Sequence, residues 1–491
     1  MLSPHSEQAE GRGRCHVLRV STRVILVAAG CWLLGARSGA AQAPPGRLDE
    51  RVTSATDTSQ TFALYLPPGY TTERRWPVLF VLDPRGRALL GLKLFQDAAA
   101  RLGWVILSSY NTLSDGPPEP NVNAVNAMLA WAQAHPSLDP TRLYLAGFSG
   151  TARAALGFAV ALRGHVAGVI AVGGALGFAL GGPETTFAGD STFAYFGAAG
   201  TRDFNYEEVL AMGDRFRTTR VPVRVVAFDG PHSWPPPYLC REALEWLELR
   251  AMLGGLRAMD SGWVRMRLGG EVARAAELER LGRWAEAARL DEAIVRDYAR
   301  WPQAGDAAAR AAALRRNAVL ARYEAEVHRL AERDLRQGIE LPKIFSWARS
   351  QRDPPALETL AGKLRIAELQ RAIERGDSLE AASARRLLAR VFVNLAFYEP
   401  RAYLTTGSPA RALRMFEAAV TIGPIQGEAC ALLREALAVA TVDQRARLAG
   451  QCVPASGEPG QIFRNASNTG SDHQRRYRVS SASAWSAVRA G

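Results

Sequence analysis

Lysine is almost absent from this chain. Lys93, Lys343 and Lys363 are the only lysines among 60 basic residues, so nearly all of the formal charge of +12 comes from arginine. The skew accompanies abundant alanine and is typical of a GC-rich coding bias rather than of selection for phosphate contacts. No basic stripe is interleaved with aromatic residues, and no nucleic-acid-binding motif is visible. We therefore expect no nucleic-acid partner.

Cysteine is also scarce, with five in 491 residues. Two of them precede position 43, which leaves Cys240, Cys430 and Cys452. An exported chain with three cysteines can hold one disulfide and one buried thiol. Cys430 and Cys452 are the plausible pair, because they lie on what look like two successive short helices. The sequence predicts no metal site and no cofactor.

The first 43 residues have the pattern of an export signal. Arg14, Arg19 and Arg23 precede an apolar run over residues 24–34, and small residues then lead to possible cleavage sites after Ala41 or Ala43. The apolar run is too short to span a bilayer comfortably. We expect an exported protein, periplasmic or secreted, with no membrane span after cleavage.

Residues 44–255 alternate strand-like and helix-like segments. Strand patterns cover residues 61–66 (an early edge strand), 77–82, 104–108, 166–172, 192–196 and 221–228, and a helix is predicted over 237–253. A chain of 491 residues is too long for one core, so two or three domains are expected. The alternation predicts the α/β class, with a doubly wound, mostly parallel sheet and a ligand site at the carboxyl ends of its strands.

One stretch in this region matches a known strand-to-helix turn. Gly147-Phe148-Ser149-Gly150-Thr151 follows a strand pattern and precedes an Ala-rich helix pattern. It keeps two of the three fixed positions of the G-x-S-x-G nucleophile elbow, with Thr151 where the last glycine is usual. Ser149 is the candidate nucleophile.

A base and an acid should follow the nucleophile in chain order. His232 lies just after the last strand pattern, which makes it the candidate base, whereas His165 comes too early. Asp203 follows the strand pattern at 192–196 and is the candidate acid, although a helix N-cap would also favour aspartate there. Asp229 is a rival acid, only three residues from His232.

Two backbone N–H groups should face the oxyanion that forms during acyl transfer. Gly150 can supply one of them. The second is expected from the loop after the central strand, at Arg85 or Gly86, since Pro84 has no N–H. Aromatic side chains that could line a substrate pocket are Phe148, Tyr110 and Trp234, with Asn111 and Phe204 as further candidates.

Together these motifs resemble the α/β-hydrolase superfamily, and in particular dienelactone hydrolases, polyhydroxybutyrate depolymerases and feruloyl-type esterases. The resemblance covers about residues 50–255 and departs from the pattern at Thr151. It implies a serine hydrolase that cleaves a small-molecule carboxylic ester through a Ser149–Asp203–His232 triad and an acyl-enzyme. A serine peptidase of the prolyl-oligopeptidase type, a transacylase and a non-catalytic protein-binding scaffold stay open as alternatives.

Residues 256–453 have helical spacing throughout and predict an all-α, helical-repeat-like region. The windows 282–294 and 407–419 resemble degenerate tetratricopeptide repeats, which would suit a protein partner, and a generic helical bundle is the alternative. Residues 454–491 are predicted to be a disordered tail. The helical region supplies none of the triad, so a chain ending near Gly255 is expected to keep the activity if it stays soluble.

The predicted leader can be tested by mass. Protein recovered from the periplasm of a Gram-negative host should have lost its first 41 or 43 residues, because signal peptidase cleaves after small residues. Intact-mass measurement distinguishes the two sites. A recovered protein that still begins at Met1 would contradict the predicted export.

Overall fold

The computed structural model describes residues 46–175 and 193–453. The predicted leader (1–43) and the predicted tail (454–491) lie outside these residues. Among the helices that are described, none is long and apolar enough to cross a membrane.

A sheet of eight strands forms the first half of the structure. Its strands are β1 (Leu48–Thr53), β2 (Thr61–Tyr65), β3 (Trp76–Leu82), β4 (Val105–Ser109), β5 (Leu138–Phe148), β6 (Val166–Val172), β7 (Ala194–Gly200) and β8 (Val223–Phe228). They are arranged in the order β1-β2-β4-β3-β5-β6-β7-β8. β1 and β2 run antiparallel to their neighbours, and all the other pairs are parallel. The predicted mostly parallel sheet is confirmed.

The edge strand was not anticipated. β1 pairs with β2 from outside, so the segment at 61–65 is the second strand and not the edge. The sequence of β1, Leu-Asp-Glu-Arg-Val-Thr, lacks apolar alternation because no residue of this strand is fully buried. Without a buried face, the strand left no pattern to detect.

Helices cover both faces of the sheet. On one face α1 (Ala88–Leu102) and α6 (Pro237–Leu253) pack into one apolar core. On the other face α2 (Glu119–Gln133), α3 (Gly150–Ala161) and α5 (Tyr206–Arg217) pack into a second core. Double coverage explains why β3 is buried along its whole length and reads as a continuous apolar run. This is the doubly wound α/β-hydrolase fold.

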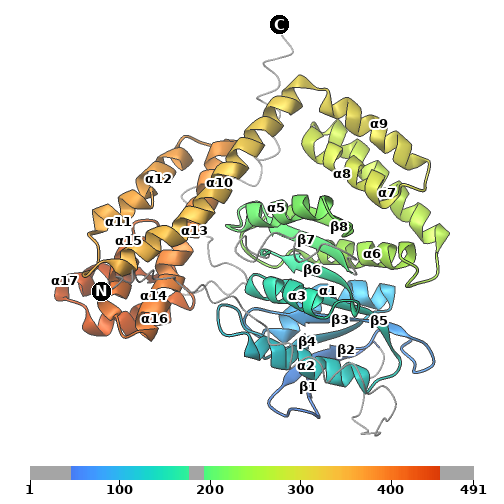
Figure 1. Cartoon of the computed structure of the whole chain (residues 1–491), viewed down its shortest axis with the longest axis horizontal. Helices are drawn as coiled ribbons and strands as arrows, with labels where there is room; N and C mark the ends of the chain where they lie inside the picture. The colour runs from blue at the N-terminus through green and yellow to red at the C-terminus, as the bar shows by residue number, and fades with distance from the viewer. Residues whose placement is uncertain (1–45, 176–192, 454–491) are drawn as a thin grey trace, which may run out of the picture.

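The second half is helical. It contains α7 (Ser261–Arg280), α8 (Trp284–Asp297), α9 (Gln303–Arg315), α10 (Ala318–Ser350), α11 (Leu357–Lys363), α12 (Ile366–Glu374), α13 (Leu379–Val393), a π-helix at Asn394–Tyr398, α14 (Glu399–Thr405), α15 (Pro409–Ala419), α16 (Ala429–Ala436) and α17 (Val442–Leu448). In Figure 1, α10 begins beside α9 and runs into the α11–α17 group, where Leu341, Phe345 and Ala348 share a core with those helices. The two repeat-like windows, 282–294 and 407–419, overlap α8 and α15. Their tetratricopeptide character stays a prediction.

Cys430 and Cys452 form a disulfide, and Cys240 is a buried free thiol. The expected location of the pair is half right. Cys430 lies on α16, but Cys452 belongs to β10 (Cys452–Val453), which pairs in parallel with β9 (Ile425–Gln426). The helical region therefore also contains a short parallel strand pair. Strands of two residues are too short to produce a recognisable sequence pattern.

The helical half shares the core of the sheet. Val264 and Leu268 of α7, Ile294 of α8 and Ala307 of α9 belong to the same apolar cluster as α1 and α6. A chain that ended near Gly255 would expose this surface to water. The expectation that such a truncated chain works alone therefore does not fit the packing.

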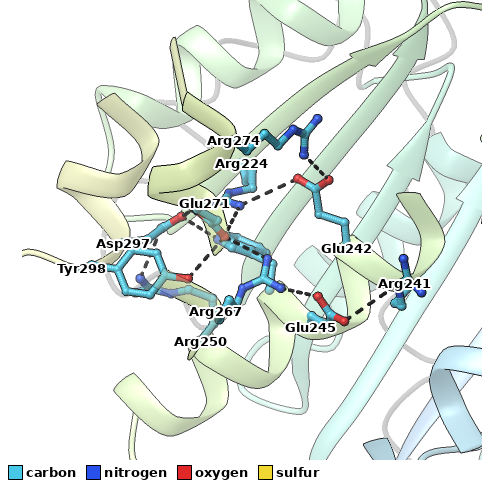
Figure 2. Close-up of polar contacts among 11 residues, drawn as sticks. Arg224, Arg241, Glu242, Glu245, Arg250, Arg267, Glu271, Arg274, Asp297 and Tyr298 are labelled. Carbon is cyan, nitrogen blue, oxygen red and sulfur yellow. Dashed lines mark hydrogen bonds and ion pairs between the residues drawn. The ribbon is translucent and has the colours of Figure 1, made fainter. Parts of the chain in front are cut away.

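Buried charges join the two halves as well. Arg224 of β8 is 3% exposed and makes paired hydrogen bonds to Glu271 of α7, at 3.0 and 2.8 Å. It also contacts Asp297 of α8 at 2.7 Å (Figure 2). Trp246 of α6 donates to the same carboxylate at 2.9 Å. Tyr298 donates to Glu271 at 3.2 Å.

The cluster favours the charged forms of Arg224 and Glu271. Burial opposes the charge of Arg224, but Glu271 and Asp297 outweigh it and hold the pKa of Arg224 well above its ordinary value. Burial alone would raise the pKa of Glu271, but Arg224 outweighs it and keeps the pKa of that carboxyl below its ordinary value. Each charge therefore depends on its partners being present.

Removal of the guanidinium tests this dependence. Arg224→Met should lower the free energy of unfolding by about 3–5 kcal/mol. Glu271 and Asp297 would lose the buried cation that they share and would keep only Arg267, at 3.1 Å, and Arg250, at 3.7 Å. Arg274→Met is the matched control, since Arg274 is 55% exposed and contacts Glu242 at the rim of the cluster; its loss should be below about 1 kcal/mol. Denaturant unfolding followed by circular dichroism measures both. Equal stabilities of the two variants would contradict the role assigned to Arg224.

Candidate active site

Ser149 occupies a strained turn between β5 and α3. Its backbone has φ 58° and ψ −125°, a left-handed conformation that non-glycine residues rarely adopt. A Cβ at position 147 would lie 2.3 Å from the Thr151 carbonyl oxygen, and one at position 150 would lie 2.0 Å from the Ser114 hydroxyl. The two glycines are thus required for the turn to close. The geometry is that of a nucleophile elbow.

Thr151 replaces the usual last glycine and has a structural use. Its hydroxyl lies 2.5 Å from the carbonyl oxygen of Leu82 in β3 and 2.8 Å from that of Phe148 in β5. It also accepts the Phe148 N–H at 3.1 Å. The Thr151 hydroxyl therefore connects the start of α3 to the carboxyl ends of two central strands.

The structure brings Ser149, His232 and Asp203 together. Nε2 of His232 lies 2.9 Å from Oγ of Ser149, and Nδ1 lies 2.8 Å from Oδ1 of Asp203. Asp203 is fully buried, while Ser149 and His232 are each 8% exposed. The rings of Phe148 and Phe204 pack on the imidazole, with centroid distances of 4.6 and 4.2 Å. The imidazole is therefore held between the hydroxyl and the carboxylate.

The rival residues lie elsewhere. The side chain of Asp229 is 85% exposed and pairs with Arg202 at the surface. His165 is exposed in the loop before β6. Neither takes part in the arrangement around Ser149.

The expected second oxyanion donor is not free. The N–H of Arg85 donates to Oδ1 of Asp83 at 2.9 Å, and the N–H of Gly86 donates to the Asp83 carbonyl at 3.1 Å. Aspartate after a strand commonly accepts such local backbone bonds, but no pattern in the sequence indicates that Asp83 does so. Gly150 is different, because it is the first residue of α3 and its N–H has no acceptor within the helix.

The three predicted pocket residues lie in different surroundings. Phe148 touches His232 directly. Trp234 packs on Phe148 and donates to Asp83 at 2.9 Å, so it links the loop of His232 to the loop after β3. Tyr110 points to the edge of the sheet instead, where its hydroxyl donates to the Glu50 carbonyl at 2.7 Å and Arg51 covers its ring.

Two glycines after β6 form part of the site and were not recognised from the sequence. A Cβ on Gly173 would lie 2.8 Å from Oδ2 of Asp203 and 3.2 Å from Cε1 of His232. A Cβ on Gly174 would lie 2.3 Å from the carbonyl oxygen of Ser149. The Gly-Gly pair directly after a buried strand was the signal that could have revealed them.

Residues of the helical half also reach the loops of the site. Arg390 donates to the side-chain oxygen of Asn205 at 3.1 Å, two residues after Asp203. Glu428 pairs with Arg85 at 3.1 Å. Both contacts lie at the carboxyl ends of strands, where the candidate residues lie, so this edge of the sheet is covered by helices. No local pattern in the sequence could pair such distant positions.

Ionisable groups at this junction are strongly affected by burial. Burial raises the pKa of Glu207 to about 7, although Arg386 contacts it at 2.7 Å. Burial opposes the charge of Arg153, but Glu208 at 2.6 Å outweighs it and raises the pKa of the guanidinium. Within the described residues, no group of three or more His, Cys, Asp or Glu side chains is arranged to hold a metal ion.

Comparison with known proteins gives likeness in structure only. No protein-family profile and no curated sequence matches the chain. Among solved structures, the chain is similar to the fluorophosphonate-binding serine hydrolase FphF of Staphylococcus aureus, with 14% identity, a TM-score of 0.34, and coverage of 42% of this chain and 99% of that one. The S-formylglutathione hydrolase FrmB of the same organism has 12% identity, a TM-score of 0.35, and coverage of 42% and 99%.

A peptidase is also among these structures. Dipeptidyl peptidase 4 of Porphyromonas gingivalis has 14% identity and a TM-score of 0.32, over 41% of this chain and 35% of that one. Identities this low, with TM-scores below 0.5, say nothing about the substrate of this chain.

The use of Thr151 can be tested by removing its hydroxyl alone. Thr151→Val keeps the shape but leaves backbone groups of Leu82 and Phe148 without a partner, and should lower the free energy of unfolding by about 1–3 kcal/mol. Thr151→Ser retains the hydroxyl and should lose less. Thermal unfolding of the two purified variants gives the comparison. A Val variant as stable as the Ser variant would contradict the proposed connection.

Proposed function

We propose that this protein is an exported serine hydrolase that cleaves carboxylic esters through an acyl-enzyme. The observation that carries the proposal is the position of the His232 imidazole, within hydrogen-bonding distance of both Ser149 and the buried Asp203. A nucleophile, a base and an orienting acid in this arrangement suit acyl transfer. The strained backbone of Ser149 supports catalysis over a scaffold role, because such strain clusters at functional sites.

The first half of the reaction forms the acyl-enzyme. Nε2 of His232 takes the proton of the Ser149 hydroxyl as its oxygen attacks the ester carbonyl carbon. The tetrahedral intermediate carries an oxyanion, for which the Gly150 N–H is the donor we assign. When it collapses, the bond to the alkoxy oxygen breaks and His232 gives its proton to the departing alcohol.

The second half returns the enzyme. His232 takes a proton from water, and the oxygen of that water attacks the acyl carbon. The bond to Ser149 then breaks, the serine oxygen recovers the proton from His232, and the carboxylic acid leaves. Throughout, Asp203 fixes the imidazole tautomer through Nδ1 and stabilises the imidazolium. For Arg85 or Gly86 to supply a second oxyanion donor, its backbone N–H would first have to break its hydrogen bond to Asp83.

The ester is the part of the proposal that experiment must decide, because the same nucleophile can attack an amide. Labelling by a fluorophosphonate probe should occur in the wild type and disappear in Ser149→Ala. Chromogenic esters of increasing acyl length and peptide anilides then separate esterase from peptidase. Labelling with turnover of the anilides alone favours a peptidase, labelling with no turnover favours a transacylase, and absence of labelling favours the protein-binding scaffold.

The identity of the acid gives a sharper test. Asp203→Asn should leave a folded protein whose kcat falls by roughly 10⁴-fold, because the imidazole loses the partner that fixes its tautomer. Asp229→Asn is the matched control and should be nearly neutral, since Asp229 is exposed and pairs with Arg202. Ester hydrolysis by both purified variants provides the measurement. The reverse ranking would show that Asp203 is not the acid.

A further inference from the structure

We propose that Arg390, in the helical half, is a positioning residue for the same reaction and acts through Asn205 on Asp203. The inference rests on the hydrolase function proposed above. It means that the helical region is part of the catalytic machinery in addition to any partner that it binds.

A continuous chain of hydrogen bonds carries the inference. Arg390 donates to Oδ1 of Asn205 at 3.1 Å, and Nδ2 of the same amide donates to the Gly173 carbonyl at 2.8 Å. The backbone N–H of Asn205 donates to Oδ1 of Asp203 at 2.7 Å, the oxygen that also accepts from His232. Asn205 therefore ties the loop after β7 to the loop after β6, and Arg390 fixes the orientation of its amide.

The charge of Arg390 has a clear use at this place. Asp203 is fully buried, and among the described residues its Oδ2 has no hydrogen-bond partner. A nearby positive charge stabilises a buried carboxylate that has an unsatisfied oxygen. Arg390 is largely buried, with 20% of its side chain exposed, and the charged groups that face it are Glu208 of α5, Arg153 of α3, Asp203 and Asp334 of α10.

The same helix offers a matched control. Arg386 lies one turn before Arg390 on α13 and also crosses to the sheet half, where it contacts Glu207 at 2.7 Å. It contacts Asp334 of α10 at 3.1 Å as well. Both arginines hold α13 against α5, but Arg390 also contacts the side chain of Asn205, whose backbone N–H donates to Asp203. A role in docking alone predicts the same effect for both residues.

The experiment compares Arg390→Met with Arg386→Met in the full-length protein. Arg390→Met should lower kcat for a chromogenic ester by roughly 10- to 100-fold, the range for loss of one charge-assisted hydrogen bond. KM should change little, because the contact acts on the imidazole and not on bound substrate. Arg386→Met should leave kcat within about twofold of the wild type, whatever its effect on thermal unfolding.

The pH profile of kcat/KM distinguishes an effect of the Arg390 charge from a purely structural role of this residue. Loss of a nearby cation makes protonation of the imidazole easier, so the acidic limb of kcat/KM should move to higher pH in Arg390→Met. Arg390→Lys keeps the charge and should restore the position of this limb. Equal kcat values and identical pH profiles for Arg390→Met and Arg386→Met would overturn the inference.

A double-mutant cycle identifies the route. Asn205→Ala retains the backbone N–H that Asp203 accepts but removes the amide that Arg390 contacts. If Arg390 acts through this amide, the double variant should be about as slow as the slower single variant. Multiplicative losses would overturn the route. If Arg390→Met does not fold, Asn205→Ala alone still tests the route, because loss of this amide should lower kcat and a wild-type kcat would overturn it.

The outcomes are distinguishable from failure of the proposed function. If Ser149→Ala retains full turnover and labelling, the hydrolase reaction itself is wrongly assigned. If Ser149→Ala is inactive and Arg390→Met matches the wild type in kcat and pH profile, the hydrolase stands and the positioning role is wrong.

Discussion

A guanidinium buried beneath the sheet is the constraint on which the rest of this structure depends. Arg224 lies on β8, but the carboxylates that offset its desolvation, Glu271 and Asp297, come from α7 and α8. The sheet therefore cannot complete its own packing, and the helices that follow must lie against it. Further along the chain, α13 meets α5 through the pair of Arg386 with Glu207, beside the candidate site.

Much of the site could be predicted because its chemistry imposes an order on the chain. A strand, a small-residue turn and a helix identify Ser149, and the loops after two later strands supply Asp203 and His232. Strands buried on both faces were recognisable as apolar runs. The choice between Asp203 and Asp229 was harder, since burial decides it and both residues stand in similar turn sequences. In the structure one is fully buried and the other is exposed.

The features that escaped prediction depend on contacts rather than on local pattern. The N–H groups of Arg85 and Gly86 looked available because nothing in the sequence shows that Asp83 accepts them. Tyr110 was an obvious aromatic candidate, but its side chain points to the edge strand β1. The polar sequence of β1 lacks the pattern by which a strand is recognised. The bond between Asn205 and Arg390 joins positions 185 residues apart, a separation over which a single sequence shows no relation.

That separation also has a consequence for how the protein is made. A ribosome adds residues from the N-terminus, so Ser149, Asp203 and His232 have all been joined to the growing chain before α7 or α13 exists. During that interval Arg224 lacks Glu271 and Asp297, and the side-chain amide of Asn205 lacks Arg390. The nascent chain then holds all three residues of the proposed triad before the bond between Arg390 and Asn205 can form. If Arg390 positions Asp203 as we infer, the order of synthesis delays completion of the candidate site until most of the chain has been translated.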